Sequence, residues 1–414
     1  MLKGKIMSVL ITLVILISIF CGQAFAEDNV LSMWTREDNE ALLRPAVKIF
    51  NEKDNNIKIE VRSIPGENFS DAFMAALAAD TAPDIVSVDL VLFPYFSSIG
   101  AFKNITDQYE SLEFKDQFIE SMLHLGSRDN SQYGLPFSAD VSALIYNKDH
   151  FREVGLDPER PPKTWDELIE YSKLLTNNNK YGYVYAGGDA GGHMFTFMPY
   201  VWGNGGQVLN EDGTEALLDS EESIEALDLF VDLTRKYQVT PSGVTSYSYT
   251  QMQDAFTSEN ASMLVTGNFV VNAFNNNHPD LDYGVALIPK NDGKSHSSFS
   301  GGELIAIPHS SEYENEAWEF MKFAFSEEIQ IDTWAKNGVI PVREDFFDNE
   351  YFRAEPKYQV FTESLTFSNV PYTTSYNEMY NPILASIQNA INGEISAKEA
   401  FETATVEINR IINR

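Results

Sequence analysis

The hydrophobic and polar positions after residue 29 form an ordered series of strand and helix patterns. Residues 30–34, 57–61 and 82–89 have strand character, with apolar side chains at alternate positions or in short runs. Between them, residues 42–50 and 69–79 carry apolar side chains at the spacing of an amphipathic helix. This alternation predicts a mainly parallel sheet flanked by helices, with a ligand crevice at the carboxyl ends of its strands.

A second α/β region is predicted from about residue 146. A helix should begin at Thr164, which starts a Thr-x-x-Glu capping pattern. The chain should re-enter the first region near Ser300. The remaining expected elements are a helix at 221–237, a strand at 303–308, helices at 314–325 and 327–336, and a crossing segment at 338–343.

The most informative pattern is the strand-like stretch at residues 135–149, LPFSADVSALIYNKD. Its apolar alternation contains a single carboxylate, Asp140, before the sequence Tyr-Asn-Lys-Asp. Burying an ionised carboxylate without hydrogen-bond donors costs several kcal/mol. A ligand that supplies hydroxyl donors would remove this cost, and a strand end where Asp140 faces water is the alternative.

The chain has 414 residues, which is more than one hydrophobic core usually supports, so two lobes are expected. We find no internal repeat and no long linker, so the lobes should be interleaved in sequence. Residues 27–139 and 299–343 are assigned to an N-terminal lobe, and residues 140–298 and 344–414 to a C-terminal lobe.

The first 26 residues have the pattern of an export signal. Two lysines precede an apolar run at 6–20, and Ala24-Phe25-Ala26 forms a small-x-small cleavage site. The protein is therefore expected to be periplasmic or secreted after cleavage near Ala26. The alternative is a lipid anchor on Cys21, the only cysteine, although Phe20 precedes it where a lipoprotein signal has a small residue.

The formal net charge is -32. So acidic a chain repels phosphate backbones and anionic lipid surfaces, which argues against nucleic-acid and peripheral membrane binding. We expect a monomer without a cofactor. The chain has no Gly-x-x-x-x-Gly-Lys phosphate loop and no Gly-x-Ser-x-Gly elbow, and its six histidines show no metal-ligand spacing.

Several short motifs occur in a characteristic order: residues 49–51, 82–86, 135–136, 146–148, 162–168, 202–206, 263–269, 301–303 and 340–343. This ordered set resembles the extracellular solute-binding proteins of ABC importers, in the carbohydrate-binding branch that includes maltodextrin-binding proteins. The resemblance implies the periplasmic-binding-protein fold, two α/β lobes joined by hinge-crossing strands. It also implies capture of a sugar, without catalysis, and delivery to permease subunits in the membrane.

A sugar site needs aromatic platforms for apolar ring faces and planar polar groups for paired hydroxyls. The residues expected to supply them are Trp34, Arg36, Glu37, Asp89, Asp140, Trp202, Asn204, Asn268, Phe269, Gly302, Glu303, Arg343 and Tyr376. Each has a plainer interpretation: core packing for Trp34 and Trp202, an exposed pair for Arg36 and Glu37, and a helix cap for Asp89. Arg343 fits a hinge salt bridge, and Tyr376 fits packing between the lobes. Phe269 stands where the family usually has Trp, which weakens that platform.

Two other functions remain open at this point. The same two-lobed receptor could bind a polyamine, with Glu37, Asp89, Asp140 and Glu303 as counter-ions beside aromatic faces. An exported glycoside hydrolase would need two carboxyl groups about 5 to 10 Å apart, and with 61 acidic residues no pair is singled out. The positive charge of Arg36 and the resemblance to sugar binders both favour a sugar.

Overall fold

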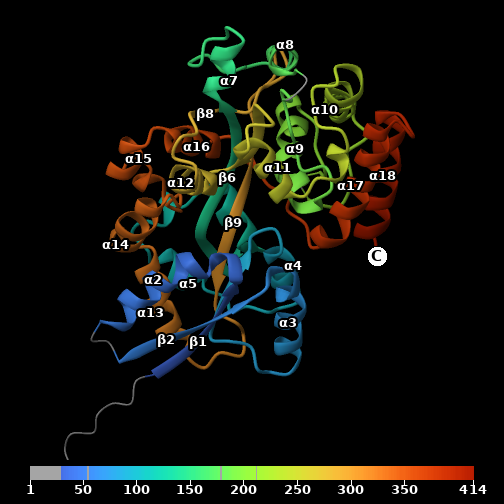
Figure 1. Cartoon of the computed structure of the whole chain (residues 1–414). Helices are drawn as coiled ribbons and strands as arrows, with labels where there is room; N and C mark the ends of the chain where they lie inside the picture. Colours follow the sequence, from blue (N-terminus) through green and yellow to red (C-terminus); the bar gives the residue numbers. More distant parts are fainter. Residues whose placement is uncertain (1–28, 54–55, 178–179, 211) are drawn as a thin grey trace, which may run out of the picture.

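The computed structural model describes residues 29–53, 56–177, 180–210 and 212–414. The expected export signal at residues 1–26, including Cys21, lies outside these ranges. Two α/β lobes are joined by β6 (Gly134–Asn147) and β9 (Ser298–Ala306), which run between the lower and upper halves of Figure 1. Within the described ranges, no helix is both long enough and apolar enough to span a membrane.

The sheet of the first lobe has the order β2-β1-β3-β9-β6. β1 (Asn29–Arg36) pairs in parallel with both β2 (Ile57–Ile64) and β3 (Ile85–Asp89), and β3 pairs antiparallel with β9. Four residues of β3 are buried and only its last residue, Asp89, is partly exposed. The carboxyl ends of β1 and β3 therefore place Arg36 and Asp89 at one edge of a buried sheet.

In the second lobe, the end of β6 pairs antiparallel with β7 (Met263–Gly267) and β8 (Tyr283–Ala286). Parallel contact in this lobe is provided by isolated bridges such as Val184 to Leu264. Short strands complete the set: β4 (Ser127–Arg128), β5 (Ser131–Gln132) and β10 (Ser368–Asn369). The two-lobed α/β fold expected from the sequence is confirmed.

Helices cover both lobes (Figure 1). Around β1 and β2 lie α2 (Glu40–Asn51), α3 (Gly66–Ala78), α4 (Phe93–Ser98), α5 (Thr106–Glu110) and α13 (Glu314–Ala324). The upper half contains α7 (Lys148–Glu153), α8 (Trp165–Leu175), α9 (Ala190–Asn204), α10 (Glu221–Val231), α11 (Tyr249–Thr257), α12 (Phe269–Asn277), α15 (Glu350–Ala354), α16 (Lys357–Leu365), α17 (Tyr376–Asn392) and α18 (Ala397–Ile412). The remaining α-helices are α6 (Glu120–Leu125) and α14 (Glu327–Ile329).

Most expected elements are confirmed, with shifted ends. The Thr164 hydroxyl accepts the N–H of Glu167, so α8 begins where the capping pattern predicted. The single helix expected at 327–336 is wrong, because α14 changes to a π-helical turn, η5 (Gln330–Trp334), and then to a 3₁₀ turn, η6 (Ala335–Asn337). The segment at 338–343 forms isolated bridges to both Ala139 and Phe118 rather than a strand.

A buried amide ties together the segments that cross between the lobes. Val141 is the last residue of β6 that pairs with β9, and the next residue pairs with β7. The Asn268 carboxamide accepts the N–H of Val141 at 3.0 Å and donates to the carbonyl oxygen of Gly338 at 3.4 Å. Asn268 is 2% exposed, so these bonds are shielded from water.

Asn268→Ala should destabilise the protein by about 1–3 kcal/mol, because it leaves the buried N–H of Val141 without its acceptor. The free energy of unfolding in urea measures this loss. Asn272→Ala is the matched control, since Asn272 also donates to a backbone carbonyl, that of Asn337 directly before the crossing segment, but is exposed. The control should change stability by less than about 0.5 kcal/mol. Equal losses in both variants would contradict the role of the buried tie.

Candidate ligand-binding site

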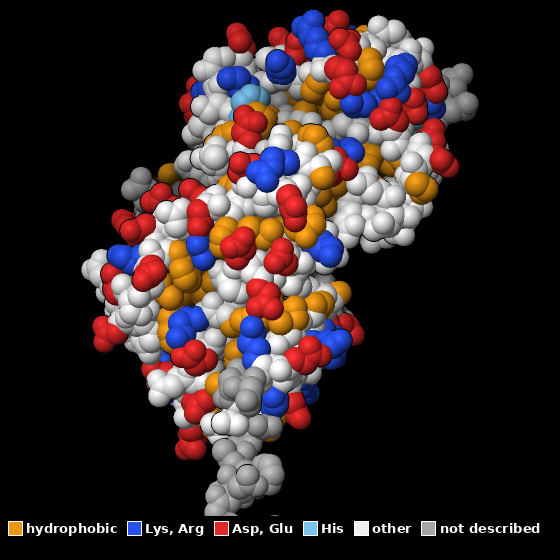
Figure 2. Space-filling view, turned by 90° about the vertical axis from the view of Figure 1, so that its left-hand side faces the viewer, with side chains coloured by type: hydrophobic (Ala, Val, Ile, Leu, Met, Phe, Trp, Pro, Cys, Tyr) orange, Lys and Arg blue, Asp and Glu red, His pale blue; other side chains and the backbone are white. Residues whose placement is uncertain are grey.

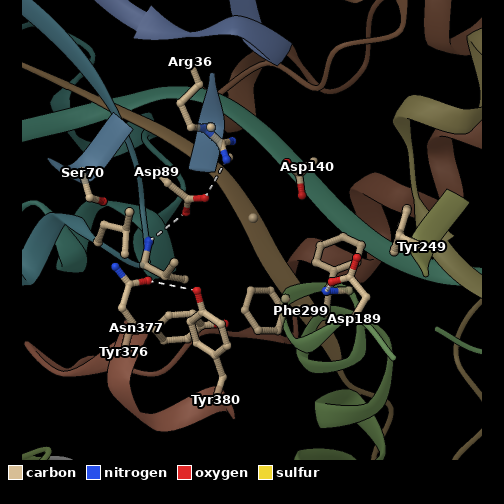
Figure 3. Close-up of a pocket in the computed structure, with 18 of the residues that line it drawn as sticks. Arg36, Ser70, Asp89, Asp140, Asp189, Tyr249, Phe299, Tyr376, Asn377 and Tyr380 are labelled. Carbon is tan, nitrogen blue, oxygen red and sulfur yellow. Dashed lines mark hydrogen bonds and ion pairs between the residues drawn. The ribbon is translucent and has the colours of Figure 1, made fainter. Parts of the chain in front are cut away.

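A cavity of about 580 Å³ lies between the two lobes and is lined by residues of both. Its size falls in the range of about 300–1,000 Å³ found for small-molecule sites. Figure 3 shows Arg36 and Asp89 on one side of the cavity, Asp189 and Tyr249 on another, and Asp140 between them. Among the described residues, we find no group of three His, Cys, Asp or Glu placed to hold a metal ion.

The wall from the first lobe contains an ion-pair network around Arg36. Its Nη1 lies 3.1 Å from Asp89 Oδ2, and its Nε donates to Glu303 Oε1 at 2.8 Å. Glu303 is 1% exposed and also accepts from Ser87 Oγ and Asn39 Nδ2. A buried carboxylate needs such donors, so Glu303 serves to hold Arg36 in place beneath the cavity.

The floor of the cavity is the crossing pair β6 and β9. Asp140 lies opposite Gly301, and an added Cβ on Gly301 would stand 2.1 Å from Asp140 Oδ1. Gly302 has φ of +119°, and a Cβ there would stand 2.0 Å from the carbonyl oxygen of Ser138. Both positions therefore require glycine. Because Gly301 has no side chain, the Asp140 carboxylate has room beside it.

The wall from the second lobe combines a carboxylate with a phenol. Asp189 is the N-cap of α9, and its Oδ1 accepts the N–H of Gly192 at 2.8 Å. The Tyr249 hydroxyl lies 2.7 Å from Thr266 Oγ1. Burial raises the pKa of Tyr249 well above its usual value, and the charges of Asp140 and Asp189 raise it further. The phenol therefore stays protonated and keeps a hydrogen to donate.

Aromatic rings line the same cavity as the carboxylates. Phe269 is 46% exposed, although large apolar side chains are usually buried. Its ring centroid lies 6.4 Å from that of Phe195 and 6.2 Å from that of Tyr249. Tyr376 and Tyr380 form a second pair with centroids 5.1 Å apart. Such rings offer apolar faces, and their neighbouring carboxylates accept hydrogen bonds from hydroxyl or ammonium groups.

Not all of the site residues expected from the sequence lie at this cavity. Those that line it are Arg36, Asp89, Asp140, Phe269, Gly302 and Tyr376. Those that do not are Trp34, Glu37, Trp202, Asn204, Asn268, Glu303 and Arg343.

Residues at the end of α9 are placed in the core instead. Trp202 is 8% exposed and packs against Phe299, with ring centroids 5.5 Å apart. Asn204 is fully buried and donates from Nδ2 to the carbonyl oxygen of Glu222, at 2.8 Å. These two side chains therefore stabilise the wall rather than form its surface.

The remaining outliers have local partners. The Arg62 guanidinium lies over the Trp34 ring at 4.7 Å from its centroid. Glu37 is exposed at the start of the turn η1 (Glu37–Asn39). Arg343 Nε donates to Asp345 Oδ1 at 3.0 Å, which agrees with the salt-bridge alternative.

Sequence reasoning missed eight lining residues that carry polar or aromatic side chains: Asp189, Phe195, Tyr249, Phe299, Asn377, Tyr380, Ser70 and Asp71. A signal for the first was available, because Asp189 stands within Gly-Gly-Asp-Ala-Gly-Gly directly before α9. Glycines beside a helix-capping carboxylate permit close backbone approach to a ligand. Tyr249 carries no comparable local signal.

Comparison with known proteins shows which family this chain is similar to. The family model of bacterial extracellular solute-binding proteins matches residues 34–331. A putative binding protein of Brucella abortus is 25% identical over 370 residues, 89% of each chain. An arabinooligosaccharide-binding protein of Halalkalibacterium halodurans is 27% identical over 350 residues, 81% of this chain and 76% of that one.

A solved structure agrees with these relatives. An ABC transporter solute-binding protein from Thermotoga lettingae, bound with alpha-D-tagatose, superposes with a TM-score of 0.81 and 27% identity. The match covers 93% of this chain and 100% of that one. The family expected from the ordered motifs is thereby confirmed. Because the family model spans most of the sequence, this chain belongs to the bacterial extracellular solute-binding proteins.

Proposed function

We propose that this protein captures a neutral saccharide between its lobes and delivers it, chemically unchanged, to the permease of an ABC importer. The observation that carries the proposal is Asp140, a carboxylate at the centre of a cavity with aromatic walls. Carboxylates accept hydrogen bonds from sugar hydroxyls, and aromatic rings cover the apolar faces of sugar rings. The arabinooligosaccharide-binding relative and the tagatose-bound structure support this ligand class.

The charges around the cavity disfavour an anionic ligand. Four aspartates line it, Asp71, Asp89, Asp140 and Asp189, against the single guanidinium of Arg36. Arg36 is already paired with Asp89 and with the buried Glu303. A phosphate or carboxylate ligand would therefore meet net negative charge, whereas hydroxyl groups would find acceptors.

The same surplus of carboxylates supports a second candidate, a polyamine. Ammonium groups are attracted both to carboxylates and to aromatic faces. The comparisons favour a sugar, because one relative is an arabinooligosaccharide-binding protein and one similar solved structure is bound with alpha-D-tagatose. We therefore rank the neutral sugar first and separate the two by experiment.

The proposal includes an extracytoplasmic location. Residues 1–26 would act as the export signal, with release after Ala26 or, alternatively, a lipid anchor on Cys21. The lobes would be residues 27–139 with 299–343, and 140–298 with 344–414, which agrees with the change of strand partners after Val141. On the face in Figure 2, basic side chains stand singly or in small groups among acidic ones. This face offers no large basic cluster for a phosphate backbone, which supports the absence of a nucleic-acid partner; that the protein is a monomer is part of the proposal.

Thermal unfolding of the mature chain in a ligand panel tests the ligand class. A saccharide at 100 times its Kd should stabilise the protein by about 2.7 kcal/mol and raise Tm. The panel contains arabinotriose, galactobiose, maltotriose, tagatose, spermidine and glucose 6-phosphate. A rise in Tm with spermidine alone would assign the protein to polyamines, and hydrolysis of a saccharide during the assay would contradict a pure binding role.

Asp140→Asn should weaken saccharide binding by about tenfold or more, because a hydrogen bond to a charged acceptor contributes about 1.5–3 kcal/mol. Isothermal titration with the best saccharide of the panel measures the change in Kd. Asp80→Asn is the control: Asp80 is exposed, does not line the cavity, and has a φ of 57° that asparagine also adopts. Unchanged affinity in Asp140→Asn would remove Asp140 from the site.

A further inference from the structure

A second hollow of about 210 Å³ adjoins the cavity between α3, α4 and the start of α17. We call it the annex and define it by Met74, Tyr95, Thr374 and Ser375, which line it but not the main cavity. The two spaces share several walls, among them Ser70 and Asn377. In Figure 3 these two residues lie at the end of the cavity opposite Asp189 and Tyr249. The annex therefore lengthens the cavity in one direction.

The annex has one aromatic face. Tyr95, on α4, is 38% exposed, although large aromatic side chains are usually more deeply buried. Its ring packs edge-on against Phe96, with centroids 5.4 Å apart, and Phe96 is 1% exposed. The Tyr95 ring is thus held from behind by the core while part of it remains open. Met74 and Leu92 add apolar surface on the same side.

The opposite side of the annex is polar. Ser375 is the N-cap of α17, yet its side chain makes no capping hydrogen bond. Asn377 and Glu378 follow it and are exposed. Hydroxyl, amide and carboxylate groups from α17 and the residues before it therefore line the annex together with aromatic and aliphatic groups from α3 and α4. Such a two-sided lining matches a sugar ring, which has an apolar face and a hydroxyl edge.

We infer that the annex is a subsite for one end of an oligosaccharide, with the Tyr95 ring as its stacking surface. This inference rests on the proposed function and deepens it: the ligand is a chain of sugar units rather than a single monosaccharide. One part of the chain occupies the main cavity beside Asp140. The next unit passes between Ser70 and Asn377 and covers Tyr95.

Titration calorimetry with saccharides of increasing length tests this subsite. The probes are arabinose, arabinobiose, arabinotriose and arabinotetraose, with galacto- and malto-series of the same lengths. Affinity in the preferred series should rise at least about tenfold when the unit that reaches the annex is added, since that unit gains contact with an aromatic face. A monosaccharide that binds as tightly as every longer member would overturn the inference.

Variants of Tyr95 separate stacking from other effects. Tyr95→Ala should lower the affinity for the long saccharide about tenfold and leave the short one unchanged, whereas Tyr95→Phe should bind both like the wild type. Ile99→Ala is a control, because it removes an exposed apolar side chain near the same helix that lines neither space. Equal losses at all lengths in Tyr95→Ala would also overturn the inference.

Two further measurements keep the outcomes distinct. Ser375→Ala removes a hydroxyl that caps no backbone group, so it should fold normally and weaken only the long saccharide. If both Ser375→Ala and Tyr95→Ala bind the long saccharide as tightly as the wild type, the annex is not a subsite. If no saccharide of any length binds to the wild type, the proposed function itself fails. If saccharides bind without regard to length, only the subsite fails.

Discussion

The antiparallel pairing of β6 with β9 is the constraint on which the rest of this structure depends. Both strands cross between the lobes, and their register sets Asp140 opposite Gly301. A side chain on Gly301 would collide with the Asp140 carboxylate, so the glycine creates the space in which that charge stands. A slip of one residue would turn Asp140 to the other face of the sheet. The pairing thus fixes both the connection of the lobes and the floor of the cavity.

The electrostatics of the cavity follow from how its one guanidinium is held. Arg36 is bound by Asp89 at the rim and by Glu303 below, so its charge is largely balanced before a ligand arrives. Asp140 and Asp189 line the same space, as Figure 3 shows. A neutral ligand with hydroxyl groups can donate further hydrogen bonds to these carboxylates without placing a new charge in a region of low dielectric, where charge is costly. Hydrogen bonds to a neutral ligand can also be broken without separating opposite charges, which makes release of the ligand easier.

The fold could be predicted largely from the sequence because its signals are local, whereas the site could be predicted only in part. Arg36 and Asp89 were expected at the site because they follow strands, whose carboxyl ends meet at one edge of a sheet, and both line the cavity. Trp202 and Asn204 were also expected there but do not line the cavity, because α9 has 15 residues and so extends for about 22 Å. Its first turn meets the cavity and its last turn is buried. Which end of a helix faces a ligand depends on how the helix packs against the other elements. The motif at residues 202–206 does not show which end that is.

The neighbours Asn268 and Phe269 connect the hinge with the cavity. The amide of Asn268 holds β6 and the crossing segment at Gly338, while the ring of Phe269 is 46% exposed at the cavity wall. A ligand shifts the balance between open and closed lobes only through contacts that differ in the two states. A sugar ring that touches both Phe269 and the residues of the opposite lobe makes such contacts only when the lobes approach. Because Phe269 directly follows Asn268 in the chain, such a contact would act beside the segments that cross between the lobes.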